Sequence, residues 1–228
     1  MTIENLDVFQ PISCVRWPIV LCLNVSPHMK KYADQLNEVL EAMINEISQT
    51  RRLNLCADVA LITYSTDLTV SEFKRASEWK NRAVSVSDCG HGDTVKAIVQ
   101  AVDTIKKRMD VLDENEFECY TPLLIVVDEL EADIFHSISD YDRERFLKET
   151  LPAFNGFDKI TAFMVDLKGS ENATCVNEEI KEQIIVLQEN DAKDAVKRVI
   201  KTFYEFIFSG MRDVEYAYRT MRERIVKN

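Results

Sequence analysis

The run LLIVV at residues 123–127 constrains the fold of this chain more than any other segment. It contains no polar residue, and Asp128 follows it directly. A strand that exposes one face to water alternates apolar and polar residues, whereas a strand covered on both faces does not. The run therefore predicts a buried strand of a parallel sheet that has helices on both of its faces.

Segments with helical spacing of apolar residues separate the other apolar runs. From 29 to 47, apolar residues recur every three or four positions, as in a helix that buries one face. Similar spacing begins near residue 94 and again near 195, a helix is expected around 139–152, and the acidic segment 110–118 is expected to be a loop. Alternation of this kind predicts an α/β fold with a mostly parallel sheet. The expected strands are 18–23, 59–64, 68–73 (a short edge strand), 123–127, 160–165 and 184–187.

Length and charge exclude several classes of protein. The 228 residues suit one large α/β domain. The net charge of −11 repels phosphate backbones, so a nucleic-acid partner is not expected. No apolar stretch approaches the ~20 residues that cross a bilayer, and the first residues lack a signal-peptide pattern. A membrane partner is therefore not expected. The six cysteines are scattered without a CxxC pair, which favours free thiols in a cytoplasmic protein.

Three polar clusters lie where ligands collect in open α/β sheets, at the carboxyl ends of strands. Segments far apart in the chain are expected to meet there and to bring Asn24, Ser26, Thr94 and Asp128 together at one edge of the sheet. The clusters are Asn24-Val25-Ser26-Pro27-His28-Met29 after the first strand, Gly90-His91-Gly92-Asp93-Thr94 before a helix, and Asp128-Glu129-Leu130-Glu131-Ala132-Asp133 after the run at 123–127.

In order and spacing, these clusters resemble the von Willebrand factor A (vWA) family, and in particular its cytoplasmic, tellurium-resistance-associated branch. In that family a D-x-S-x-S motif ends the first strand, a Gly-rich loop supplies a Thr, and a later apolar strand ends in Asp. Ser26, Thr94 and Asp128 match these positions, whereas Asn24 stands in place of the first Asp and His28 in place of the second Ser.

The resemblance covers residues 15–208 and implies a Rossmann-like vWA domain. Its sheet would have about six strands, one of them an antiparallel edge, with helices on both faces. Residues 1–14 would form an N-terminal extension. Residues 209–228 would form a helical tail, in which apolar residues are spaced like two heptads.

The family's site holds Mg²⁺ or Mn²⁺, and a carboxylate of a protein partner completes the coordination. The resemblance therefore implies Ser26, Thr94 and Asp128 as metal ligands, with Asn24 and His28 tuning or disabling the site. Mg²⁺ prefers hard oxygen ligands. An amide in place of a carboxylate removes a full negative charge, so a weakened Mg²⁺ or Mn²⁺ site is expected.

The histidines leave two other readings of the site open. His28, His91 and His136 all fall near the expected strand ends, and Cys89 lies two residues before His91. Imidazole and thiolate are zinc ligands, so the cluster could hold Zn²⁺. Alternatively, the imidazoles fill a vacated site, and no metal binds.

Motifs of several enzyme classes are absent from the sequence: a P-loop, a GxGxxG after a strand and a GxSxG elbow. The favoured function is a non-enzymatic protein-interaction module, which the tellurium-resistance resemblance places in a bacterial stress-response or defence system. Two alternatives stay open. One is a metal-dependent hydrolase that uses the His and carboxylate cluster, and the other is a structural assembly protein that acts through its C-terminal helix. The sequence predicts neither the identity of the partner nor the oligomeric state.

Overall fold

The computed structural model describes residues 15–79, 82–130, 134–135, 138–154, 159–168, 180, 183–188 and 191–207. Several expectations from the sequence lie outside these residues. They concern the N-terminal extension 1–14, the end of the domain at 208, the helical tail 209–228, His136 and the acidic segment 131–133.

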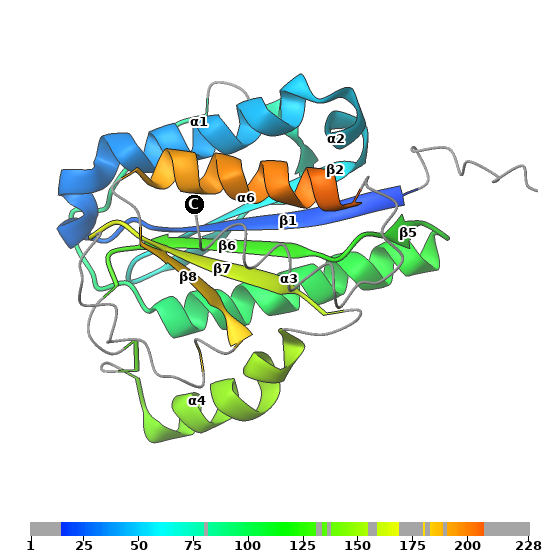
Figure 1. Cartoon of the computed structure of the whole chain (residues 1–228). Helices are drawn as coiled ribbons and strands as arrows, with labels where there is room; N and C mark the ends of the chain where they lie inside the picture. Colours follow the sequence, from blue (N-terminus) through cyan, green and yellow to red (C-terminus); the bar gives the residue numbers. More distant parts are fainter. Residues whose placement is uncertain are drawn as a thin grey trace, which may run out of the picture.

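A sheet of mostly parallel strands forms the middle layer of the molecule (Figure 1). In the described part of the chain, its strands are β1 (Val15–Asn24), β2 (Ala57–Tyr64), β3 (Leu68–Val70), β4 (Lys74–Arg75), β5 (Glu118–Cys119), β6 (Leu123–Asp128), β7 (Thr161–Asp166) and β8 (Ile185–Gln188). The main path is β3-β2-β1-β6-β7-β8, and the short β4 and β5 pair with β2 and β1 beside it. Only the pairings of β3 and β4 with β2 are antiparallel among the described strands. The α/β fold with an antiparallel edge strand is confirmed.

Helices cover both faces of the sheet (Figure 1). One face carries α1 (Ala33–Gln49) and α6 (Ala192–Ile207), and the other carries α3 (Thr94–Glu114) and α4 (Asp140–Arg145). The shorter helices are η2 (Pro27–Tyr32), α2 (Arg51–Cys56), η3 (Ala76–Trp79), η4 (Phe146–Thr150) and η5 (Leu151–Ala153). None of the described helices combines the length and apolarity that crossing a bilayer requires.

The strand β1 shows why its sequence lacks polar alternation. Successive side chains of a strand point to opposite faces. Ile19 and Leu21 pack in the core under α1 and α6, whereas Val20 and Cys22 pack in the core under α3. All four are fully buried. The run at 123–127 lies in β6 between β1 and β7 and is buried in the same way, as its sequence predicts.

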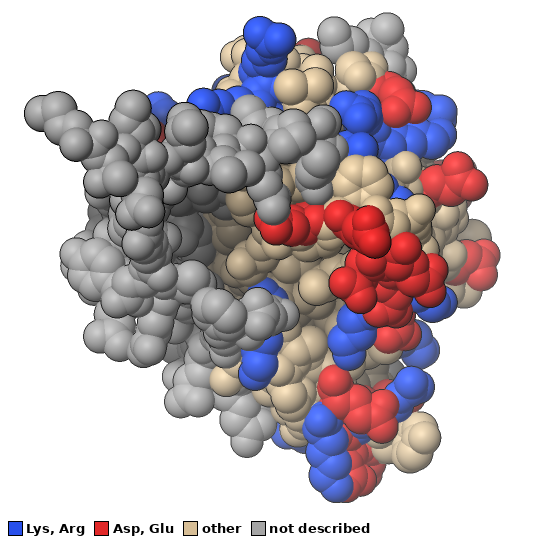
Figure 2. All heavy atoms as spheres, turned by 90° about the vertical axis from the view of Figure 1, so that its right-hand side faces the viewer, with Lys and Arg blue, Asp and Glu red and all other residues tan. Residues whose placement is uncertain are grey.

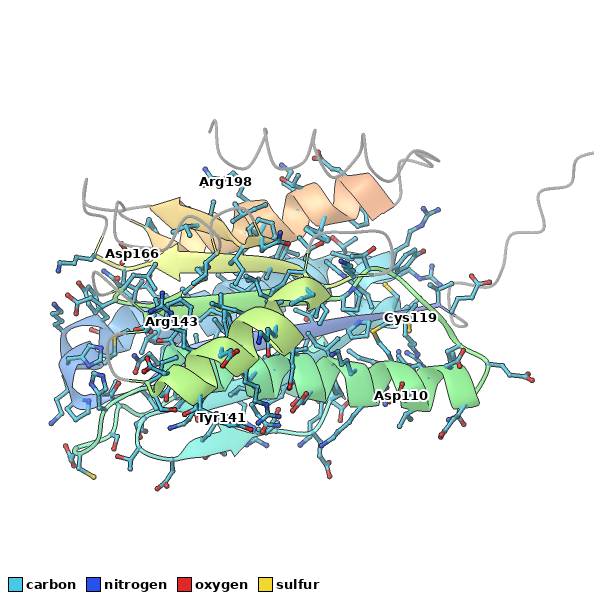
Figure 3. The ribbon with its side chains drawn as sticks, turned by 90° about the horizontal axis from the view of Figure 1, so that it is seen from below. Asp110, Cys119, Tyr141, Arg143, Asp166 and Arg198 are labelled. Atoms are coloured by element: carbon cyan, nitrogen blue, oxygen red, sulfur yellow. The ribbon has the colours of Figure 1, made fainter. Side chains whose placement is uncertain are left out.

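One element expected from the sequence is wrong. The segment 110–118 is not a loop: α3 continues to Glu114, and β5 follows at Glu118. Leu112 continues the buried stripe of α3 about two helical turns after Ile105. Asp110 lies on the outer side of the helix (Figure 3). The acidic residues are therefore the solvent face of a helix.

The expected helix around 139–152 is divided into three pieces. An α-helical segment, α4, passes into a π-helical turn, η4, and then into the 3-10 turn η5. Pro152 has no N–H and cannot continue an α-helical ladder, which agrees with its place in the 3-10 turn η5. The first expected helix likewise begins as the 3-10 segment η2 and becomes α-helical at Ala33.

Candidate functional site

The carboxyl ends of β1, β2 and β6 and the start of α3 meet at one edge of the sheet (the left in Figure 1). Asn24 ends β1, Tyr64 ends β2, and Asp128 ends β6, while Thr94 begins α3. Ser26 follows β1 by two residues. The structure thus brings together the four residues that the sequence places at one edge, and it adds Tyr64.

The carboxylate of Asp128 is the centre of this cluster. Its Oδ1 accepts a hydrogen bond from Asn24 Nδ2 at 2.7 Å. Its Oδ2 accepts one from Thr94 Oγ1 at 2.5 Å and one from the Tyr64 hydroxyl at 2.9 Å. All five residues of the cluster are buried, and Asp128 is 4% exposed. A buried carboxylate without partners would be strongly destabilising, and these neutral donors compensate for its lost hydration.

The side-chain amide of Asn24 links the two halves of the cluster. Its Nδ2 faces Asp128, and its Oδ1 accepts hydrogen bonds from the Ser26 backbone N–H, at 2.9 Å, and from the Ser26 hydroxyl. A backbone N–H can only donate, and a carboxylate can only accept. The chemistry of the neighbours therefore fixes which end of the amide faces which residue.

Gly92 lies directly against the Asn24 amide. A Cβ at this position would lie 2.7 Å from both Oδ1 and Nδ2 of Asn24 and 2.8 Å from the Ser26 hydroxyl oxygen. No side chain fits in that space without displacing the amide. Glycine is therefore required here by the close approach of the loop to the cluster. The same loop ends at Asp93, which caps α3: its Oδ1 accepts a hydrogen bond from the backbone N–H of Lys96.

Burial dominates the electrostatics of the cluster. It raises the pKa of Asp128 above its ordinary value, although hydrogen bonds from Thr94, Asn24 and Tyr64 act in the opposite direction. Burial, and then the charge of Asp128, raise the pKa of Tyr64 well above its ordinary value. Tyr64 thus keeps its proton and acts as a donor to Asp128.

The histidines lie at the rim of the cluster. The ring centroids of His28, in η2, and His91 are 6.3 Å apart. Within the described residues, His28 Nε2 is buried and has no hydrogen-bond partner. Cys89 is exposed, and its thiol is free. Among the described residues, no three His, Cys, Asp or Glu side chains are grouped closely enough to hold a metal ion.

Two ion pairs hold η2 over the cluster. Lys30 Nζ lies 2.8 Å from Asp88 Oδ1, and Lys31 Nζ lies 2.7 Å from Glu129 Oε1. Both lysine side chains remain more than half exposed, at 58% and 57%. The segment η2 is thus tied on one side to the loop before α3 and on the other to the loop after β6.

Sequence analysis missed two residues of this edge. Tyr64 lies directly opposite Asn24 in the β1–β2 register, and its place at the end of a predicted strand was the available signal. Asp166 ends β7, as Asp128 ends β6, and its Oδ1 accepts from the backbone N–H groups of Leu130 and Lys168. Asp166 thus anchors the loop that follows Asp128.

The opposite end of the sheet has a different character. Cys119 and Asp166 lie at opposite ends of the sheet (Figure 3). Acidic side chains gather on one part of this side of the molecule (Figure 2). Cys119 and several acidic residues line a groove of about 630 Å³. None of the predicted site residues lines this groove, whose lining residues are Met109, Asp110, Asp113, Glu116, Phe117, Glu118 and Cys119.

Comparison with known proteins gives structural similarity only. No family model and no curated protein matches the chain. An aerotolerance-related membrane protein from Bacteroides fragilis is similar over 82% of this chain and 97% of its own, with 11% identity and a TM-score of 0.49. Proximal thread matrix protein 1 from the mussel byssus, with a zinc-occupied MIDAS motif, is similar over 81% of this chain, with 14% identity and a TM-score of 0.48.

Two further structures extend the comparison. The ArnB paralog VWA2 from Sulfolobus acidocaldarius is similar over 80% of this chain, with 12% identity and a TM-score of 0.45. The pilus adhesin SpaC from Lactobacillus rhamnosus GG is similar over 50% of this chain, with 14% identity and a TM-score of 0.40. The chain spans 46% of the mussel protein, 44% of VWA2 and 14% of the adhesin. Proteins of the vWA type are thus among its structural neighbours.

The arrangement of the donors does not fit a divalent cation. Asp128 is the one carboxylate among the described residues of the cluster, and both of its oxygens accept hydrogen bonds. Asn24 Oδ1 accepts from Ser26, and the hydroxyl of Thr94 donates to Asp128. A Mg²⁺ ion needs several oxygen lone pairs directed at one point. Here those lone pairs are directed at internal donors instead.

Proposed function

We propose that this chain is a non-enzymatic protein-binding module of the vWA type, which binds its partner at the carboxyl edge of the sheet. The convergence of Asn24, Ser26, Thr94 and Asp128 from separate segments carries this proposal. These residues occupy the positions at which the vWA resemblance places a partner-binding site. The segment η2, which carries the exposed Lys30 and Lys31, begins directly after Ser26.

The partner is expected to contribute an acidic side chain. Lys30 and Lys31 are more than half exposed, and their present partners, Asp88 and Glu129, belong to the same rim. The pair of Lys30 with Asp88 is exposed at both ends and contributes little to stability, so an incoming carboxylate can exchange with Asp88 at low cost, whereas Glu129 is only 14% exposed. The lysines of η2 would then receive the acidic side chain of the partner.

A divalent cation has a weakened role in this proposal. The mussel neighbour is described with zinc in its MIDAS motif, which supports divalent-metal chemistry at an edge of this kind. The vWA resemblance implies a weak Mg²⁺ or Mn²⁺ site on Ser26, Thr94 and Asp128, with Asn24 and His28 reducing its affinity, but the internal hydrogen bonds of Asp128 oppose metal binding in the unaltered chain. A cytoplasmic location and a role in stress response or defence rest on the sequence resemblance alone and stay predictions.

The two alternative functions depend on residues outside the described part of the chain. A metal-dependent hydrolase would use the His and carboxylate cluster, of which His136 and residues 131–133 lie outside the described residues, and an assembly role would use the tail, residues 209–228. Metal analysis of the purified protein tests the first, because stoichiometric zinc would favour it. The oligomeric state after deletion of residues 210–228 tests the second.

Charge reversal at the rim tests the main proposal. The full chain carrying Lys30→Glu and Lys31→Glu is used as bait in a lysate of the native host, next to the unaltered chain. The matched control carries Lys106→Glu and Lys107→Glu, which reverse the charge of two adjacent exposed lysines of α3. We expect the rim variant to lose a partner that the control retains. If both variants capture the same partner equally, the proposed binding edge is wrong.

A further inference from the structure

We infer that the hydrogen bond from the Asn24 amide takes the place of a divalent cation in stabilising the Asp128 carboxylate, so that this edge is complete without metal. A single substitution, Asn24→Asp, would convert it into a Mg²⁺ or Mn²⁺ site. The inference deepens the proposed function, because it concerns the regulation of the same edge. It rests on that proposal only where partner binding is concerned, since the metal chemistry can be measured without a partner.

The hydrogen bonds of Asp128 carry the first step. The side chain is almost fully buried, yet no cationic side chain forms an ion pair with it among the described residues. Asn24 Nδ2 lies 2.7 Å from Oδ1, and the Thr94 and Tyr64 hydroxyls satisfy Oδ2. A buried carboxylate needs either an opposite charge or several donors. Here the donors suffice.

The surroundings of Asn24 carry the second step, because they prevent the amide from turning away. Rotation by half a turn would place the amide N–H₂ against the Ser26 backbone N–H and the amide oxygen against Asp128. Both contacts would be repulsive. The backbone of Gly92 packs against the same amide, close enough that a Cβ there would lie 2.7 Å from both of its ends. The amide is therefore a fixed donor that points at Oδ1.

The substitution Asn24→Asp keeps the shape of this side chain and changes its chemistry. One oxygen of the new carboxylate would keep the two hydrogen bonds from Ser26. The other would replace the donor that now lies 2.7 Å from Asp128 Oδ1. Two carboxylates at that separation repel each other strongly unless a cation or a proton lies between them. The hydroxyls of Ser26 and Thr94 supply the further hard oxygens that Mg²⁺ and Mn²⁺ prefer.

The experiment measures the thermal unfolding of purified full-length protein in EDTA, MgCl₂ and MnCl₂. The unaltered chain is expected to unfold at the same temperature in all three. Asn24→Asp is expected to unfold at a lower temperature in EDTA and to gain about 5 °C in saturating Mn²⁺, the size of shift that specific binding gives a chain of this length. Near-UV circular dichroism confirms that each variant is folded.

The double variant Asn24→Asp with Asp128→Asn is the matched control. It exchanges the amide and the carboxylate, and so keeps one charge and one donor between the two positions. It is expected to show no response to Mn²⁺, because only one carboxylate is present. A response of this variant equal to that of Asn24→Asp would place the bound ion elsewhere and overturn the inference.

Two other results would also overturn it. One is a folded Asn24→Asp chain without any Mn²⁺ response. The other is an unaltered chain that Mn²⁺ stabilises and whose response Asp128→Asn abolishes. If Asn24→Asp folds in none of the three solutions, the thermal unfolding of the unaltered chain in Mn²⁺ decides whether the inference holds. If the unaltered chain loses its captured partner in EDTA, the inference is wrong but the proposed function stands. If the variant with Lys30→Glu and Lys31→Glu retains the partner, only the proposed function is wrong.

Discussion

Two buried aspartates lie near opposite ends of the sheet and are stabilised in different ways. Asp58, near the start of β2, is 5% exposed, and Asp128, at the end of β6, is 4% exposed. Asp58 faces two guanidinium groups: Arg108 Nη2 lies 2.5 Å from its Oδ2, and Arg16 Nη1 lies 3.9 Å from its Oδ1. Asp128 faces three neutral donors instead.

The strands β1 and β2 contribute to both sites. β1 has Arg16 near its first residue and Asn24 at its last, while β2 has Asp58 near its first and Tyr64 at its last. The same strand pair therefore supports an ion pair at one end and a neutral hydrogen-bonded cluster at the other. An opposite charge cancels the charge of a carboxylate, whereas hydrogen bonds from neutral donors stabilise that charge without cancelling it. Asp58 therefore lies in an ion pair, whereas Asp128 lies in a cluster whose own donors satisfy both of its oxygens.

The largest effect is expected from Asp58→Asn. It leaves Arg16 and Arg108, whose side chains are 15% and 26% exposed, without their carboxylate. Removal of one partner of a buried ion pair costs about 3 kcal/mol where the pair keeps some access to water. Urea denaturation at neutral pH measures the loss of free energy of unfolding. A loss below about 1 kcal/mol would show that the two ends do not differ in the expected way.

The second effect concerns the geometry of the neutral end rather than its charge. Gly92→Ala is expected to cost about 2 kcal/mol, because the new methyl group overlaps both ends of the Asn24 amide. In a chain that already carries Asn24→Ala, the overlap is gone, and the cost of Gly92→Ala should fall. A double-mutant cycle by urea denaturation measures this coupling. An unchanged cost in the Asn24→Ala background would show that Gly92 does not act on the amide.

The sequence predicts the framework of this molecule well for a definite reason. β1 and β6 are buried on both faces, so their apolar runs are uninterrupted. The run at 123–127 gives β6 to within one residue, whereas β1 begins three residues before its run, at Val15. The acidic end of α3 was mistaken for a loop because one side of the helix faces water there, and only Leu112 marks its buried side. In the segment around 139–152, Pro152 is a local signal for the final 3-10 turn, but no local pattern marks the point at which α4 passes into the π-helical turn.

The candidate site could be predicted only in part from the sequence. Motif positions identify Asn24, Ser26, Thr94 and Asp128, because strand ends at one edge of a parallel sheet must meet. They do not reveal that the Asn24 amide donates to Asp128 or that Tyr64 completes the cluster. Those contacts depend on the register of β2 against β1 and on the side-chain orientations, which a single sequence does not specify.

A smaller effect is expected from Asp128→Asn, the counterpart of Asp58→Asn. The new amide removes a buried charge but places its own N–H₂ near that of Asn24 or near the two hydroxyl donors. One unsatisfied donor costs about 1 kcal/mol after the gain from removing the charge. The same urea experiment gives the comparison directly. A loss as large as that of Asp58→Asn would mean that a charge partner, rather than neutral donors, stabilises Asp128.

The smallest effect is expected in the pH dependence of stability. Burial raises the pKa of Asp128 above the value of about 3.9 of an unfolded chain, while its hydrogen bonds oppose the rise. The folded state thus binds this proton more tightly than the unfolded state does. The resulting stabilisation is complete below the unfolded pKa and is lost as the pH rises through the folded pKa.

Relative to Asp128→Asn, the unaltered chain should therefore lose free energy of unfolding as the pH rises from about 4. Urea titrations of both proteins between acidic and neutral pH measure the difference. A difference that grows with pH instead would mean that hydrogen bonding outweighs burial and that the Asp128 carboxylate is already fully stabilised within the protein.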